Sequence, residues 1–168
     1  MFNRILIPML AALPMFAASG PSPCAANSEA RQLDYWLGDW SVGTPEAPNT
    51  GHSKVSISLD KCLLTESWGS DTSNHQGENA LAYNPEDKTW YGLFVDNRGR
   101  VHALKGVVTA GSAEFQGPSR DANGKVVLNK VKVVRVKHDS VEQIWQKSSD
   151  NGASWTTDVQ MQYSRKRP

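Results

Sequence analysis

No stretch of this sequence is apolar for long enough to cross a membrane as a helix. The longest apolar run, residues 5–18, contains two prolines and falls short of the roughly 20 residues that a membrane span needs. Arg4 precedes the run and small residues follow it, which is the pattern of a secretory signal peptide. We therefore expect residues 1–19 to be a signal peptide. Residues 20–168 then form one exported domain, periplasmic or secreted, whose mature chain does not insert into the membrane.

The sequence also lacks an excess of charge of either sign. The chain has 18 basic and 17 acidic residues, and loss of residues 1–19 would remove Arg4 alone, leaving 17 of each. A net charge near zero gives no electrostatic reason to expect nucleic acid or an anionic membrane as a partner. The basic stretch at 130–137 alternates with valines and predicts a solvated strand face.

Motifs for metals, cofactors and common catalytic centres are missing. The histidines lie in separate segments, with no pair two or four residues apart: His52, His75, His102 and His138. Because haem-binding barrels need an inward histidine on a late strand, a turn position for His138 and a middle strand for His102 fit haem poorly. We expect no metal site and no cofactor. We also find no Ser/His/Asp set, phosphate-binding glycine loop or paired-carboxylate motif.

Cysteine is scarce, with only Cys24 and Cys62. In an oxidising compartment an even number permits a disulfide, and closing a loop of about 39 residues would stabilise the fold by roughly 3–4 kcal/mol. Two unrelated thiols are the alternative. Signal-peptide cleavage after Ser19 would keep Cys24, whereas cleavage after Ala26 would remove it.

What the sequence does contain, from Asp39 onward, is a series of short β-like segments. Val55, Ile57 and Leu59 alternate with polar residues, a period of two that indicates one buried face. We expect a first strand from Asp39 and further strands near 53–59, 62–68, 78–83, 90–96, 101–105, 113–117, 125–136, 141–147 and 155–163. Asn-Gly pairs at 123–124 and 151–152 predict tight hairpin turns.

The N-terminal part of the mature chain carries a weaker helical signal. After an extended lead-in at 21–23, Ser28 can cap a short helix or 3₁₀ turn that ends at Gly38. No helix of crossover length interrupts the later segments, so the strands must be joined by hairpins in an antiparallel sheet. About ten strands can form a sandwich or a barrel, and barrel closure would remove exposed edges.

Two motifs predict structural contacts. In lipocalin-like barrels a Gly-x-Trp opens the first strand and an arginine of the last strand lies over the tryptophan; Gly38, Trp40 and Arg165 resemble this arrangement. Such a cation–π contact contributes roughly 0.5–2 kcal/mol.

Residues 148–155 match the Asp-box pattern, with Asp150 in the turn and Trp155 at its end. Sialidases repeat this box in every blade, so a single copy predicts a stable hairpin and no glycosidase.

Further residues extend this likeness over nearly the whole mature chain. They are Cys24, 31–40, 51–53, 62–64, Glu66, Trp68, Tyr83, Trp90, 95–97, Gln143, Trp145, Trp155 and 163–166. With them the chain resembles a group of small exported bacterial domains of unknown function with a lipocalin-like (calycin) barrel. The resemblance implies a Cys24–Cys62 bridge and cleavage before Cys24, and it assigns no reaction. The chain departs from the pattern at Asn79, Gly92 and Phe94.

The fold class we predict is therefore all-β: a single antiparallel lipocalin-like β-barrel of about ten strands with a short N-terminal helix. Strand parity then suggests which side chains share the interior. We expect an aromatic cup, with two polar points, that binds a ligand. Its residues would be Glu66, Trp68, Asn79, Tyr83, Trp90, Phe94, Trp145 and Met161.

Three hypotheses of function follow from this cup. The first is a binding module for a small apolar or amphipathic molecule. The second is a small-molecule enzyme in which Glu66, the one catalytic candidate, acts as general acid or base because burial raises its pKa. Glu66 could instead be satisfied by arginine or backbone donors, or lie near the rim. The third is an envelope or interaction protein with a filled core. Nothing in the sequence indicates the ligand or the oligomeric state.

Overall fold

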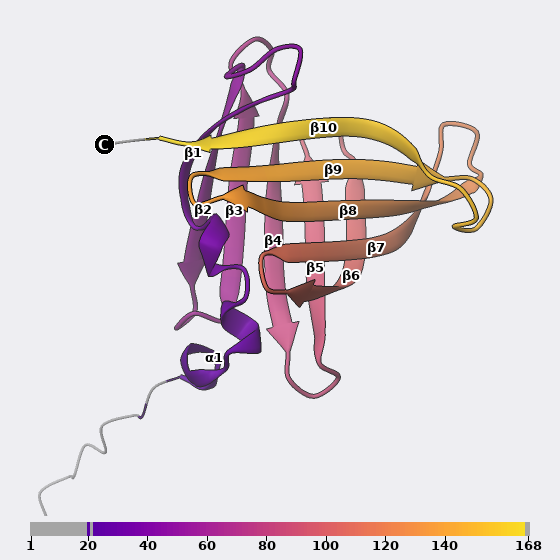
Figure 1. Cartoon of the computed structure of the whole chain (residues 1–168). Coiled ribbons are helices and arrows are strands. Elements are labelled where there is room, and N and C mark those ends of the chain that lie inside the picture. Colours follow the sequence, from indigo (N-terminus) through magenta and orange to yellow (C-terminus); the bar gives the residue numbers. More distant parts are fainter. Residues whose placement is uncertain (1–19, 21, 167–168) are drawn as a thin grey trace, which may run out of the picture.

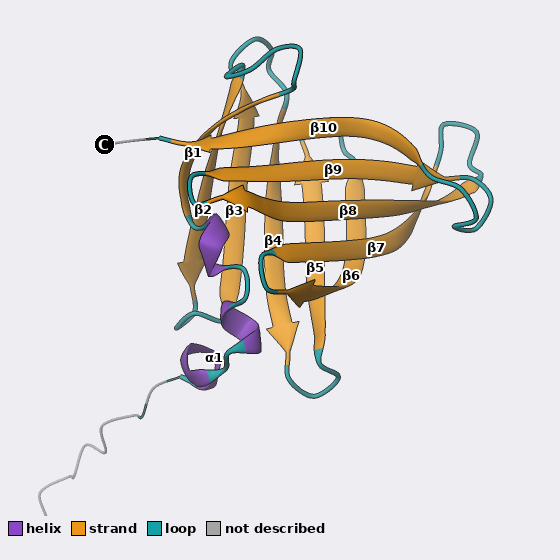
Figure 2. Ribbon diagram, viewed as in Figure 1, coloured by secondary structure: helices purple, strands orange, loops and turns teal. Residues whose placement is uncertain are grey.

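The computed structural model describes residue 20 and residues 22–166, so the predicted signal peptide lies outside the described residues. All-β architecture is confirmed: ten antiparallel strands form a closed barrel in sequence order, with β10 paired to β1 (Figures 1 and 2). The strands are β1 (Gly38–Gly43), β2 (Gly51–Ser58), β3 (Leu63–Ser70), β4 (Gln76–Asn84), β5 (Thr89–Asp96), β6 (Val101–Thr109), β7 (Ser112–Arg120), β8 (Val126–Lys137), β9 (Ser140–Ser148) and β10 (Thr156–Arg165). Within the described part of the chain, no helix reaches the length and apolarity that crossing a bilayer demands.

Because neighbouring strands are antiparallel, their connections alternate between the two ends of the barrel. One end carries the loops 44–50, 71–75, 97–100, 121–125 and 149–155, and we call it the open end. The other end carries the short connections and the N-terminal segment, and we call it the closed end. In Figure 1 the open-end loops lie at the top and the right, and the N-terminal segment lies at the lower left.

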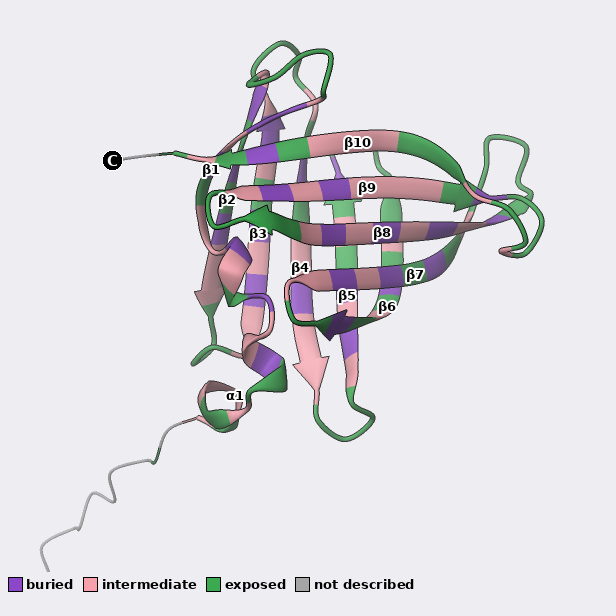
Figure 3. Cartoon of the chain, in the orientation of Figure 1, coloured by how far each residue is buried: buried purple, intermediate pink, exposed green. Residues whose placement is uncertain are grey.

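Burial alternates along the strands, as the period of two predicts (Figure 3). On β8, Val127, Val131 and Val133 are buried in the interior, and Lys132 points outward. The prediction of a solvated basic face is only partly right. The side chain of Lys130 is only 14% exposed, because its ammonium lies 3.9 Å from the centre of the Trp155 ring.

The N-terminal segment contains more helix than the sequence suggests. A short helix, α1 (Pro23–Ala26), begins where we expected an extended lead-in; Ser22 caps it and Pro23 occupies its first turn. Of the predicted short helix or 3₁₀ turn, the second alternative is confirmed: the segment forms two 3₁₀ turns, η1 (Glu29–Arg31) and η2 (Asp34–Trp36). Ser28 does not cap them with its side chain. Instead, the carboxamide oxygen of Asn27 accepts hydrogen bonds from the backbone amides of residues 29 and 30.

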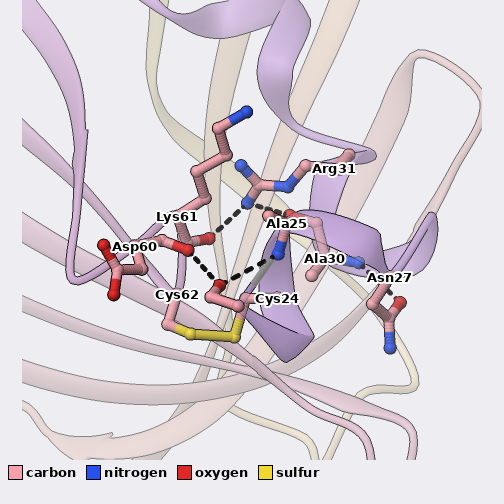
Figure 4. Close-up of a disulfide and its surroundings, with 9 residues drawn as sticks. Cys24, Ala25, Asn27, Ala30, Arg31, Asp60, Lys61 and Cys62 are labelled. Carbon is pink, nitrogen blue, oxygen red and sulfur yellow. Dashed lines mark hydrogen bonds between the residues drawn. A yellow bond between two sulfur atoms is a disulfide. The ribbon is translucent and has the colours of Figure 1, made fainter. Parts of the chain in front are cut away.

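A disulfide ties this segment to the barrel, which confirms the bridge between Cys24 and Cys62 (Figure 4). Two hydrogen bonds flank it: the Ser22 hydroxyl donates to the Asp60 carbonyl, and the Arg31 guanidinium donates to the Lys61 carbonyl over 2.6 Å. The disulfide and these bonds hold α1 and η1 against the β2–β3 turn.

The β2–β3 turn itself differs from the prediction. We expected Leu59 to continue the buried face of β2, but the strand ends at Ser58 and Leu59 is 70% exposed. Leu59, Asp60 and Lys61 all have positive φ, between 49° and 73°. Three successive left-handed residues reverse the chain and turn Leu59 away from the core.

The first and last strands meet at the Gly-x-Trp motif. Trp40 and Arg165 are opposite each other in the β1–β10 register, and the guanidinium carbon lies 4.2 Å from the centre of the indole ring. Arg165 also donates to the carbonyls of Leu37 and Tyr35 over 2.7 and 3.1 Å. Gly38 has a φ of 125°, and a Cβ there would lie 2.5 Å from the Arg165 guanidinium. The expected closure of the barrel by this motif is therefore present.

The two Asn-Gly pairs do not form the tight two-residue turns that we predicted. Both pairs lie inside longer open-end loops, 121–125 and 149–155. Asn151 and Gly152 both have positive φ, whereas at the first pair only Gly124 does. The Asp150 carboxylate accepts bonds from the Ser148 and Ser154 hydroxyls, so the Asp-box forms a turn closed by side chains.

Candidate functional site

The barrel is filled at its closed end. Trp36 from η2 packs edge-on against Tyr163, with ring centres 5.9 Å apart, and Trp40 packs against the same ring from a centre 6.3 Å away. The Trp40 indole N–H donates to the Trp36 carbonyl over 2.8 Å. All three aromatic side chains are almost fully buried. These side chains therefore close the barrel and form a floor beneath its open half.

Above this floor the open half contains a cavity of about 890 Å³. Its lining comes from nine of the ten strands, all except β4, together with the loops 44–50, 71–75, 97–100 and 121–125. The lining includes Glu66, Trp68, His75, Phe94, His102, Gln143, Trp145, Met161 and Tyr163. Small-molecule sites in proteins usually measure about 300–1,000 Å³. The cavity is therefore large enough to enclose such a ligand.

The walls of the cavity are aromatic. Phe94 on β5, His102 on β6 and Trp145 on β9 form one cluster, with ring centres 5.1 to 6.0 Å apart. A second aromatic contact in the lining joins Trp68 on β3 to His75, which pack edge-on with ring centres 4.9 Å apart. Aromatic rings offer large apolar faces at a small cost in side-chain freedom. The walls therefore suit a ligand with a flat or apolar body.

The floor carries one buried carboxylate, Glu66 on β3, which is only 2% exposed. Its Oε1 accepts hydrogen bonds from the Ser53 hydroxyl over 2.8 Å and from the Tyr163 hydroxyl over 2.9 Å. Its Oε2 accepts one from the Asn79 amide over 2.8 Å. Burial raises the pKa of Glu66, and these three donors offset part of the increase. The same burial and the nearby carboxylate raise the pKa of Tyr163 well above its usual value.

A second polar pair extends this network along the floor. The Trp145 indole N–H donates to Gln143 Oε1 over 2.9 Å, and the Tyr163 hydroxyl lies 3.4 Å from the same oxygen. Both residues line the cavity, so the network joins Glu66 to the aromatic wall. Its hydrogen bonds keep the carboxylate and the indole in fixed positions.

The structure separates the predicted cup residues into two groups. Glu66, Trp68, Phe94, Trp145 and Met161 line the cavity. The other three do not, although strand parity places them on the inner face. Tyr83 and Trp90 pack against each other at the closed end, with ring centres 5.8 Å apart. Asn79 reaches the site only through Glu66, and Gly92 lies against Leu81 below the cavity.

Parity identifies the inner face of a strand and says nothing about depth along the barrel axis. Tyr83 and Trp90 lie near strand ends that meet at the closed end, and there the space is occupied by packed side chains. Tyr83 and Trp90, which we predicted to line the cup, therefore lie in the core below the cavity and do not line it.

Sequence reasoning missed two histidines of the lining. His75 follows a polar turn with no signal of burial, yet its Nε2 lies 3.0 Å from the Asp96 carboxylate. Arg100 and two backbone amides also donate to Asp96; burial raises its pKa, but these bonds outweigh burial and hold the pKa well below its usual range. The cluster fixes the 97–100 loop at the mouth of the cavity.

His102 points into the cavity and its pKa is lowered, first by burial and then by the charges of Arg100 and Lys147. A neutral imidazole is therefore favoured there. In the described part of the chain, no three His, Cys, Asp or Glu side chains cluster closely enough to hold a metal ion. The arrangement offers a cavity with aromatic walls and charged side chains at its mouth, a neutral histidine, and a carboxylate on the floor that can accept a hydrogen bond or a proton.

Comparison of the chain with models of known protein families finds no match, and comparison with curated proteins finds none either.

Proposed function

We propose that the protein is an exported binding module that holds a small, partly apolar molecule in the open half of its barrel. The cavity of about 890 Å³ carries this proposal, because it has the size of a ligand site and aromatic walls. Trp68, Phe94, Trp145 and Met161 would contact the body of the ligand.

Binding is favoured over the two alternatives. A filled core, as an interaction protein would have, is at odds with the size of the cavity. For general acid–base catalysis Glu66 would have to exchange a proton with a substrate, but three hydrogen-bond donors already hold its carboxylate. A carboxylate held in this way is suited to orienting a bound group.

Export is the second part of the proposal. The Cys24–Cys62 disulfide supports an oxidising compartment, because disulfides persist in periplasmic and secreted proteins. The barrel and its Gly38–Trp40–Arg165 closure support membership of the lipocalin-like exported group. N-terminal sequencing of the protein from a periplasmic extract should find a chain that begins at Gly20. A chain beginning at Met1 in the cytoplasmic fraction would contradict export.

Titration with N-phenyl-1-naphthylamine tests binding, since this neutral dye fluoresces in apolar sites. We expect saturable binding of one dye per chain. Phe94→Ala removes part of the aromatic wall and should weaken binding about tenfold or more, given the roughly 1.5–3 kcal/mol gained by burying such a side chain. The matched control is Leu93→Ala, since Leu93 is its neighbour on β5 and points outward, 45% exposed. Absence of saturable binding, or equal weakening in both variants, would refute the proposal.

A further inference from the structure

Glu66 is a buried carboxylate whose three hydrogen-bond donors are all neutral groups. Among the described residues, the ion pairs join other acids to basic side chains and none involves Glu66. Buried carboxylates in proteins are normally paired with a cation, because an unpaired buried charge is costly. The position therefore lacks a positive partner.

The free acceptor position of this carboxylate is on Oε2. An ionised carboxylate has about four acceptor positions. Ser53 and Tyr163 use two on Oε1, and Asn79 uses one on Oε2. Since Glu66 lines the cavity, a hydrogen-bond donor that enters from the open end can occupy the fourth acceptor position.

The surrounding walls also favour a cation. Trp68, Phe94 and Trp145 line the same cavity, and aromatic faces attract positive charge by roughly 0.5–2 kcal/mol or more when water is excluded. They equally provide apolar surface for the rest of a ligand. A carboxylate below aromatic walls is complementary to a positively charged group on an apolar body.

We propose that the ligand is an organic amine, which enters with its ammonium group first and pairs with Glu66 while its apolar body lies against Trp68, Phe94 and Trp145. This inference rests on the proposed binding function and specifies the chemistry of its ligand.

Charged groups of both signs lie near the cavity. His102, the histidine in the aromatic cluster, is held in its neutral form by burial and by the nearby cations. At the mouth, Arg100 is paired with Asp96 and Lys147 with Asp158. Arg98 and Arg120 also line the cavity there, and among the ion pairs of the described residues neither has an acidic partner. Glu78, next to the site on β4, adds a further negative charge, which raises the pKa of Glu66 in addition to the larger effect of burial.

Displacement of N-phenyl-1-naphthylamine by three probes with similar bodies tests the inference: phenethylamine, 2-phenylethanol and 3-phenylpropionate, all at pH 7.5. We expect the amine to displace the dye at a concentration at least tenfold lower than the alcohol, and the carboxylate to be the weakest. Glu66→Gln should bring the amine and the alcohol to within about twofold, while the dye still binds. The matched control, Glu78→Gln, changes a neighbouring exposed carboxylate and should keep the preference for the amine.

The outcomes separate this inference from the proposed function. If the dye binds but the wild-type protein prefers no probe, or prefers the alcohol or the carboxylate, the amine inference is overturned and the binding function stands. An amine preference that survives Glu66→Gln also overturns it, because another group then selects the amine. If the dye does not bind to wild type, the binding function itself fails. The comparison in wild type decides the selectivity even if Glu66→Gln does not fold.

Discussion

Replacing Glu66 by glutamine should make the stability of the protein respond differently to pH. The substitution removes the charge and nearly keeps the shape. Oε1 of the new side chain can still accept from Ser53 and Tyr163, and Asn79 can rotate its amide so that its oxygen accepts the new N–H. The variant is therefore expected to fold with its three hydrogen bonds satisfied.

The sign of the effect follows from burial. The pKa of Glu66 is raised above 4.5 in the folded protein, so the folded state keeps the proton at a pH where the unfolded chain has lost it. The stability from this proton is fully present below about pH 4.5 and is lost as pH rises through the folded pKa. Each unit by which the pKa is raised corresponds to about 1.4 kcal/mol. The glutamine variant has no such titration.

Urea unfolding followed by tryptophan fluorescence, from pH 4 to pH 8, measures this difference. The free energy of unfolding of wild type should fall relative to that of Glu66→Gln by about 1.4 kcal/mol per pH unit above pH 4.5, and then level off. Ser53→Ala removes a donor that lowers the pKa of Glu66, so in that variant the fall should continue to higher pH. A difference that is constant with pH, or that changes in the opposite sense, would refute the buried, unpaired carboxylate.

Three further predictions concern the barrel itself. Replacing Cys24 and Cys62 by serine opens a loop with a sequence separation of 38 and should lower the free energy of unfolding by about 4 kcal/mol, seen as a lower urea midpoint. Arg165→Met removes the cation–π contact and two hydrogen bonds to carbonyls and should cost about 2–4 kcal/mol in the same assay. The Asp150 carboxyl should titrate by NMR with a pKa of about 2, and Ser154→Ala should move that pKa toward 3.8, because the Ser154 bonds lower it most. The stabilisation from Asp150 is thus present above pH 3.8 and is lost as pH falls through 2.

The architecture could be predicted because an antiparallel sheet leaves local signals in the sequence, namely alternating apolar and polar residues and short connections. Alternation such as that on β8 identifies a buried and a solvated face, and the absence of crossover helices requires hairpins. Trp40 and Arg165 could be matched across the whole chain because their contact depends on residue type at the two ends. The disulfide was implied by resemblance, and the structure confirms it.

The candidate site was harder to predict because the alternation of residues along a strand identifies which side chains point inward but not where they lie along the barrel axis. Glu66 and Trp68 line the cavity, whereas Trp90 is equally inward and lies below it. Whether an inward side chain lines the cavity depends on how far the closed end is filled. Trp36, in an N-terminal 3₁₀ turn, helps to fill it by packing against Tyr163. His75 could not be found, because its position depends on a loop bonded to Asp96.

Turns were mispredicted where side chains or neighbours decide the backbone. Leu59 has a residue type that favours a strand, but it lies in a left-handed turn held against the N-terminal segment by the disulfide and two hydrogen bonds. At 121–125 the Asp121 carboxylate accepts amides two and four residues ahead, so the loop is closed by a side chain and the Asn-Gly pair is not its centre. Such bonds depend on loop length, which local turn preferences do not fix.

The most direct test of the account is a high-resolution crystal structure of the protein with N-phenyl-1-naphthylamine. We predict density for one dye inside the barrel, against Trp68, Phe94 and Trp145, with the floor network around Glu66 intact. A barrel whose open half is filled by its own side chains, with the dye absent or bound outside, would contradict the claim that this cavity is a ligand site.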